Sequence, residues 1–196
     1  MGNPRIGGLL VVIVYLAGCA HPMIVRPDID RLAVVAEGSR VPKTVGLYIS
    51  PEKLNKEVIT SGGGGDKVSY RPYADMEAGL YRVLGNVFQD AEVLKSMSDV
   101  DTIAKHSVVY VAVPEIITTS SSSGIFTWMA TDFTVQLTCK FTDVAGRPVT
   151  SLSSTGTGHA EFAELKHNVS LAGERASEDA LAKLQTSLQQ STELRK

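Results

Sequence analysis

FTVQLTCKF, from Phe133 to Phe141, is the stretch that decides the fold, because apolar and polar side chains alternate along it. Successive side chains of a β-strand point to opposite faces of the sheet. The alternation therefore predicts a strand with one face in the core and one face in water. It places Cys139 on the core face. A buried thiol keeps a raised pKa and behaves as a small apolar side chain, so we expect no nucleophilic role for Cys139.

The segments around this strand predict further strands. Residues 143–148 contain the Asp, Gly and Pro of a chain reversal, and residues 149–162, rich in Ser, Thr and Gly, form the expected return strand. Upstream, residues 107–113 are almost continuously apolar, which predicts a central strand covered on both faces and ending near Pro114. The Ser- and Thr-rich residues 118–124 are expected to form a polar loop.

Helical periodicity appears in two places. Residues 75–88 carry apolar side chains on one face of a 3.6-residue period, and Asp75 is expected to cap their first turn. A final helix is expected from Leu171 onward, with Ser177 as its cap. Both apolar faces are expected to pack on a sheet.

Shorter elements complete the prediction. Val45, Leu47 and Ile49 alternate with polar or small residues and predict a first strand. Residues 91–94 are expected to form a short strand and residues 96–104 a helix or turn capped by Ser98 or Asp99, whereas residues 54–59 fit either a helix or a strand. The glycines at 62–65 lack the Lys-Ser/Thr pair of a phosphate-binding loop, so we expect a hairpin loop there.

This order, strand, helix, short strand, three strands and helix, predicts an α+β fold. The economical packing is a single domain over residues 44–196, with a mixed or antiparallel sheet of about four to five strands and two main helices on one side.

The amino terminus predicts export. Arg5 precedes an apolar run over residues 6–17, and twelve helical residues span only about 18 Å, against about 30 Å of hydrocarbon in a bilayer. Residues 1–18 are therefore expected to be a signal peptide rather than a transmembrane anchor. Prolines and a glycine scattered through residues 20–43 predict a flexible tether.

Leu16, Ala17, Gly18 and Cys19 resemble the lipobox of bacterial lipoproteins. The resemblance implies cleavage after Gly18, a diacylglyceryl thioether on Cys19 and a fatty acyl chain such as palmitate on the new amino terminus. The alternative is an ordinary secretory signal with an incidental cysteine. Ala20 follows Cys19, where enterobacterial lipoproteins retained in the inner membrane carry aspartate. The resemblance thus implies an outer-membrane, periplasm-facing protein, with the inner membrane as the alternative.

The composition and motifs argue against several functions. With 19 Lys+Arg and 21 Asp+Glu in 196 residues, the chain lacks the basic excess typical of nucleic-acid binding. Its four histidines have no zinc-site spacing, and neither Cys-x-x-Cys nor Gly-x-Ser-x-Gly occurs. His159 and Glu161 are expected on one strand face without forming a catalytic site. We therefore expect no enzyme activity, no catalytic residue, no metal and no cofactor.

Residues 84–189 resemble the small envelope lipoproteins of the TolB amino-terminal-domain-like and YajG-like type. The resemblance rests on a helix ending at Phe88, a buried strand over residues 108–113 and a long strand ending at Asp143. Gly146, a further strand and a terminal helix follow. Members of that group serve as accessory parts of envelope machines, and some form rings.

The resulting expectation is a lipid-anchored accessory or assembly protein of a transport, secretion or appendage complex. Its partner would be an envelope protein or further copies of the same chain. Exposed apolar clusters often mark such contacts, and the candidate contact residues are Ile125, Phe126, Trp128 and Met129. The alternatives are a lipoprotein that binds a hydrophobic ligand or a glycan, and a self-associating structural spacer.

Overall fold

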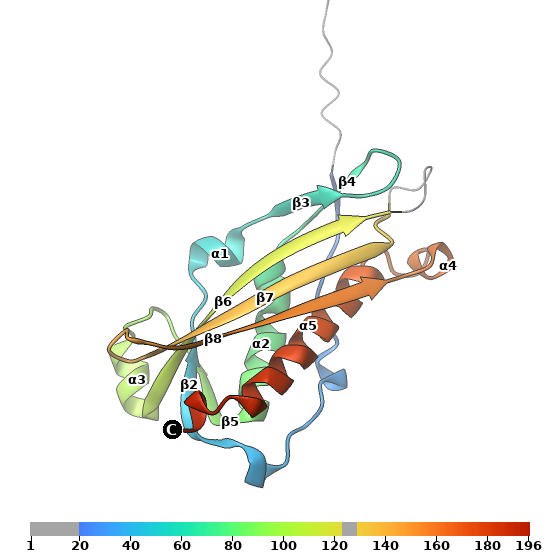
Figure 1. Ribbon diagram of the computed structural model, residues 1–196. Helices are drawn as coiled ribbons and strands as arrows, with labels where there is room; N and C mark the ends of the chain where they lie inside the picture. Colours follow the sequence, from blue (N-terminus) through green and yellow to red (C-terminus); the bar gives the residue numbers. More distant parts are fainter. Residues whose placement is uncertain (1–19, 123–128) are drawn as a thin grey trace, which may run out of the picture.

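A five-stranded sheet forms the centre of the computed structural model, which describes residues 20–122 and 129–196 (Figure 1). The strand order is β5-β2-β6-β7-β8. The strands are β2 (Val41–Leu47), β5 (Phe88–Val93), β6 (Val108–Ser121), β7 (Asp132–Asp143) and β8 (Pro148–His159). β2 runs parallel to β5 and β6, whereas β6, β7 and β8 are antiparallel to one another in turn.

Two long helices, α2 (Pro72–Val87) and α5 (Leu171–Gln190), pack on one face of this sheet (Figure 1). The predicted α+β class, with a mixed sheet and two main helices on one side, is confirmed. Within the described residues, none of the helices is both long enough and apolar enough to cross a membrane.

β7 is built as its alternation predicts. Phe133, Val135, Leu137, Cys139 and Phe141 are all buried under the helices. Burial raises the pKa of the Cys139 thiol to about 12, so this thiol behaves as a small apolar side chain.

β6 is longer than predicted and continues through Pro114 and the expected polar loop to Ser121. Its pairing with β2 ends at Ala112, so Pro114 interrupts no ladder on that side. The carbonyl of Pro114 instead accepts a hydrogen bond from Lys53 Nζ at 3.3 Å, and the next amide on that edge, of Ile116, donates to Tyr73 Oη at 3.1 Å. Tertiary hydrogen bonds thus replace the missing neighbouring strand.

A second sheet, of three strands, was not predicted. It has the order β1-β4-β3 and consists of β1 (Ala20–Pro22), β4 (Lys67–Tyr70) and β3 (Val58–Ser61). β3 and β4 form a hairpin whose turn contains Gly64 and Gly65 at positive φ, which confirms the predicted hairpin loop. The sheet lies along the second half of β6, where the Tyr70 hydroxyl donates to Thr118 Oγ1 at 2.7 Å.

The segment expected to be a flexible tether is packed on the domain. Five of its apolar side chains are buried: Met23, Val25, Leu32, Val35 and Val41. The prolines and glycine that predicted flexibility instead accompany an irregular path with two short 3₁₀ turns, Ile29–Arg31 and Glu37–Ser39. Burial of these side chains outweighs the local tendency toward an extended, mobile chain.

The short helices are α1 (Pro51–Asn55), α3 (Val100–His106) and α4 (Phe162–Leu165), and a 3₁₀ turn, Glu193–Arg195, ends the chain. Asp99 caps α3 as predicted, by accepting from the amide of Thr102. The other two predicted caps are wrong. α2 begins at Pro72, so Asp75 lies inside the helix, and Ser177 is buried in the interior of α5.

α5 lies unusually close to β8. A Cβ atom at Gly158 would lie 2.0 Å from the carbonyl oxygen of Ala172, and one at Gly156 would lie 2.1 Å from that of Ala176. Glycine on the strand and alanine on the helix therefore allow the two backbones to touch.

Polar side chains of α5 also cover part of the free edge of β8. Lys183 donates to the carbonyl of Thr155 at 2.9 Å, and the amide of Thr157 donates to Asp179 at 2.9 Å. Such coverage blocks a further strand from pairing along this part of the edge.

Candidate functional site

Most residues that the sequence nominates lie outside the described part of the chain. This applies to the lipobox residues Leu16, Ala17, Gly18 and Cys19 and to the contact candidates Ile125, Phe126 and Trp128. Met129 is described, and it is 8% exposed and belongs to the core. Met129 therefore does not offer a contact surface, because its side chain is buried in the core.

The described chain starts in a paired strand at the residue after Cys19. Ala20 of β1 lies opposite Lys67 of β4, and Pro22 lies opposite Ser69. The amide of Met23 then donates to the carbonyl of Ser69 at 2.9 Å. Since consecutive Cα atoms are about 3.8 Å apart, the candidate lipidation site is joined to the fold without a spacer.

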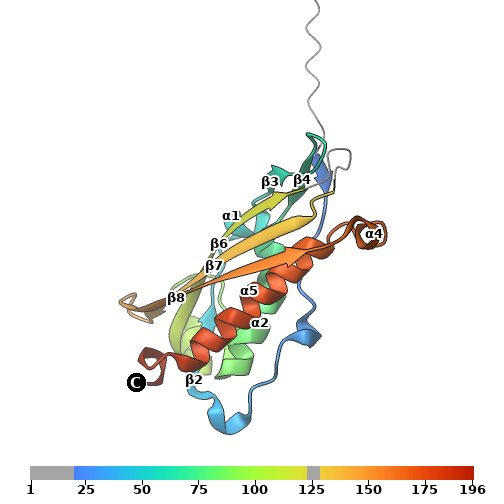
Figure 2. The same ribbon diagram turned by 45° about the vertical axis from the view of Figure 1, so that its right-hand side comes forward.

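Three features lie at one end of the molecule, which we call the β1 end: β1, the hairpin loop at residues 62–66, and α4. Figure 1 shows all three at the end opposite α3 and the carboxyl terminus, and Figure 2 shows the same separation from the carboxyl terminus. The pairing of β1 with β4 links the first two features. The amide of Ile24, just after β1, donates to Ser170 Oγ at 3.0 Å and links β1 to the connection between α4 and α5.

A second hydrogen bond fixes the chain after β1. The amide of Val25 donates to the Asp75 carboxylate at 3.1 Å, and Asp75 is itself buried in α2. Burial raises the pKa of Asp75, while this hydrogen bond and the nearby Arg26 and Arg71 act in the opposite direction. The contact between Asp75 and Val25 could not be predicted from local patterns, because the two residues lie 50 apart in the sequence.

α4 is a short, firmly held helix with an exposed aromatic residue. Arg175 of α5 binds both carboxylate oxygens of Glu164, at 2.8 and 3.2 Å, which lowers the pKa of Glu164 to about 2. Phe162 is 43% exposed, and Lys166 Nζ lies 5.0 Å from the centre of its ring.

His159 forms an ion-pair cluster near α4. Its Nδ1 lies 2.8 Å from Asp132 Oδ1, and its Nε2 lies 3.2 Å from Glu161 Oε1. The hydrogen bonds to Asp132 and Glu161 raise the pKa of His159. Glu161 lies beside His159 as predicted, but β8 ends at His159 and Glu161 is the N-cap of α4, so the two residues do not share a strand face. Asp132 was missed because it meets His159 only through the register of β7 and β8. Both ring nitrogens are engaged, so the cluster resembles a structural ion pair more than a general base.

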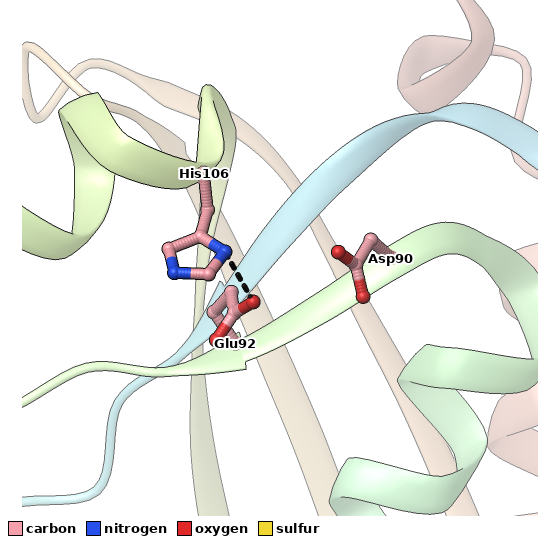
Figure 3. A group of neighbouring side chains, drawn as sticks. All are labelled: Asp90, Glu92 and His106. Atoms are coloured by element: carbon pink, nitrogen blue, oxygen red, sulfur yellow. Dashed lines mark ion pairs between the residues drawn. The ribbon is translucent and has the colours of Figure 1, made fainter.

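A second cluster combines Asp90 and Glu92 of β5 with His106 at the end of α3 (Figure 3). Their potential metal-binding atoms all lie within 4.8 Å of one another. His106 Nδ1, however, is 2.6 Å from Glu92 Oε1, and Asp90 accepts a hydrogen bond from the amide of Ala91 at 2.9 Å. The His106–Glu92 ion pair by itself explains the proximity of these two residues.

A groove runs between the segment after β1 and the start of α5. Its volume is about 560 Å³, and it is broadly open to solvent. Its lining includes exposed Ile24, half-buried Val169 and the carboxylate of Glu174.

No protein-family model matches the chain, and no curated protein matches it. Among solved structures, protein XCC0632 from Xanthomonas campestris has a TM-score of 0.47 and 13% identity, over 87% of this chain and 92% of that one. A PelC dodecamer from Paraburkholderia phytofirmans has a TM-score of 0.44 and 16% identity, over 80% and 93%. A minor lipoprotein from Acinetobacter baumannii has a TM-score of 0.35 and 12% identity, over 76% and 92%. Likeness at this level says nothing about the function of this chain, and the TolB-like or YajG-like resemblance stays a prediction.

Proposed function

We propose that the chain is a lipid-anchored, periplasm-facing accessory protein of a cell-envelope complex in the outer membrane. Acyl chains on Cys19 hold it to the membrane, and the folded domain binds another envelope protein without catalysis. Two or three acyl chains suffice for a stable anchor, whereas a single chain gives only marginal binding.

The direct junction between Cys19 and β1 carries this proposal. The lipobox-like sequence ends at Cys19, and the next residue is already hydrogen-bonded into a sheet of the domain. The junction therefore ties a membrane anchor to a packed domain at a fixed place, as expected for a protein that positions a partner at a membrane.

The uncovered face of the five-stranded sheet is available for that partner. Helices α2 and α5 cover the opposite face, whereas Ile117 of β6 is 63% exposed on this one. Phe126 and Trp128 follow in the sequence a few residues after β6 ends. We propose that these three apolar residues contribute to one protein contact.

Capture from membranes tests the proposal. The intact lipoprotein is crosslinked in cells, purified from membranes and examined by quantitative mass spectrometry. We expect one or two envelope proteins in stoichiometric amounts, and their loss in a Phe126→Ser/Trp128→Ser variant whose thermal unfolding is unchanged. Val100→Ser, on α3 and 71% exposed in the native protein, is the matched control and should retain the partner.

Two results would contradict the proposal. Recovery of the lipoprotein alone would contradict the proposed binding of an envelope protein. Recovery of further copies of the same chain only would favour a self-associating spacer. A large loss of thermal stability in the double variant would instead place Phe126 and Trp128 in the core.

The groove beside Ile24 favours a second candidate function, the binding of a hydrophobic ligand or a glycan. Its volume of about 560 Å³ falls within the range of small-molecule sites. Native mass spectrometry of the purified protein would show a retained ligand as a reproducible added mass. A bare protein mass would argue against this function.

A further inference from the structure

We infer that the β1 end of the domain rests directly on the lipid surface, with Phe162 at the membrane interface. The inference rests on the proposed acylation of Cys19. It adds the orientation of the domain and a second contact with the membrane besides the acyl chains.

The first step concerns distance. The headgroup layer on each side of the hydrocarbon core is roughly 5–8 Å thick. Acyl chains attached to Cys19 lie in the hydrocarbon, so the Cys19 backbone is held near the headgroups. Ala20 follows about 3.8 Å further along the chain and is already paired with Lys67. The β1–β4 strand pair therefore begins at the level of the headgroups.

The second step concerns orientation. A domain on a flexible tether could turn any face toward the membrane, but here the chain is fixed immediately after the anchor. Ile24 is hydrogen-bonded to Ser170 near the start of α5, and Val25 is hydrogen-bonded to Asp75 in α2. These bonds fix the anchored end of the chain on the domain, so the short link to Cys19 keeps the β1 end next to the bilayer.

The third step concerns the side chains that this orientation presents. Phe162 is 43% exposed, and Ile24 is 53% exposed. Lys166 lies over the Phe162 ring, and Lys67 is exposed at the start of β4. An aromatic ring beside a long basic side chain suits the interface, because the ring can enter the acyl boundary while the ammonium group stays among the headgroups.

Four carboxylates at the same end do not oppose this contact strongly, because each of the four has a cationic or ionisable partner. Asp66 lies 3.5 Å from His21, and Glu164 is bound by Arg175. Glu161 and Asp132 both contact His159, whose raised pKa favours its charged form. The surface is therefore close to electrically balanced, and its apolar residues can approach headgroups of either charge.

Fluorescence quenching by brominated lipids tests the contact. Trp128 is the sole tryptophan, so a Trp128→Phe background is silent, and Phe162→Trp places a reporter at α4. Val100→Trp in the same background reports from α3, at the other end (Figure 1). The full lipoproteins are reconstituted in vesicles of phosphatidylethanolamine and phosphatidylglycerol, with and without brominated acyl chains. We expect bromine to reduce the emission of the Phe162→Trp variant and to leave that of the Val100→Trp variant unchanged.

Intact mass of each preparation separates the two possible failures. A chain without acyl groups would contradict the proposed function itself. An acylated chain whose Phe162→Trp reporter is quenched no more than the Val100→Trp reporter would overturn the membrane contact and leave the proposed function standing.

Hydrogen exchange of the wild-type lipoprotein provides a second measurement that needs no tryptophan reporter. Amides at residues 62–66 and 162–167 should exchange more slowly in vesicles than in the non-acylated Cys19→Ser protein in solution, while those at residues 100–106 should not change. Equal exchange at the β1 end in both states would overturn the inference.

Discussion

Replacing Gly158 by alanine should disrupt the close packing of α5 against β8. The added Cβ would lie 2.0 Å from the carbonyl oxygen of Ala172 and 2.5 Å from the amide nitrogen of Ala176, both backbone atoms of α5. Carbon–oxygen contacts in proteins are normally about 3.3–3.6 Å. No side-chain rotation can relieve the clash, so α5 must move away from β8 by more than about 1 Å.

The cost follows from what α5 buries. Its inner face carries Leu181, Leu184 and Leu188, all fully buried, and displacement of the helix loosens their packing. Overpacking of a core typically costs about 1–3 kcal/mol when side chains can adjust, so a clash between backbones should cost about 3 kcal/mol or more.

Urea denaturation of the soluble Cys19→Ser protein, with and without the Gly158→Ala change, measures this loss. Gly85→Ala is the matched control, because a Cβ at Gly85, inside α2, meets no atom within 4 Å. That change should stabilise the protein by about 0.5–1 kcal/mol. The argument that backbone contact fixes α5 on β8 would be refuted if Gly158→Ala lowered the free energy of unfolding by less than about 1 kcal/mol. It would also be refuted if both variants changed the free energy of unfolding in the same direction.

Three further predictions concern titratable groups. Asp75→Ala leaves the buried amide of Val25 without an acceptor, which costs about 1–3 kcal/mol of stability. We therefore expect limited proteolysis to cut this variant within residues 20–30 sooner than it cuts the wild-type protein. An unchanged digestion pattern would contradict this prediction. Cys139, with a pKa of about 12, should resist thiol reagents at neutral pH until the protein unfolds, so rapid labelling of the native protein would contradict its burial. NMR titration should give His159 a pKa above 6.5. Because the folded state raises this pKa, the stability that His159 contributes is fully present below the unfolded pKa and is lost as pH rises through the folded value. His159→Gln should therefore weaken the dependence of the free energy of unfolding on pH in this range, and an unchanged dependence would contradict the ion-pair assignment.

Local patterns predicted the elements that local forces determine. The alternation from Phe133 to Phe141 gave β7 and the burial of Cys139, and the 3.6-residue period gave α2. The extension of β6 past Pro114 could not be predicted, because its exposed edge is supported by Lys53 and Tyr73 from distant parts of the chain.

Some signals were present in the sequence but needed tertiary information to interpret. Ala172, Ala176 and Ala180 recur every four residues, and Gly156 and Gly158 lie two apart, which is the pattern of a tight helix–strand contact. Only the structure shows that these two sets face each other.

The amino-terminal segment shows how local signals can mislead. Met23 and Val25 are buried while Ile24 between them is exposed, but Ile24 is also apolar, so the sequence shows no alternation there and the neighbouring prolines predicted a tether. The pairing of β1 with β4 and the hydrogen bond to Asp75 settle the packing, and both depend on contacts far apart in sequence.

The intact mass of the protein purified from membranes tests the anchor on which both proposals depend. We predict a chain that begins at Cys19 and carries the added mass of a diacylglyceryl group and an amide-linked acyl chain. A chain that begins at another residue, or one that begins at Cys19 without lipid, would contradict the account.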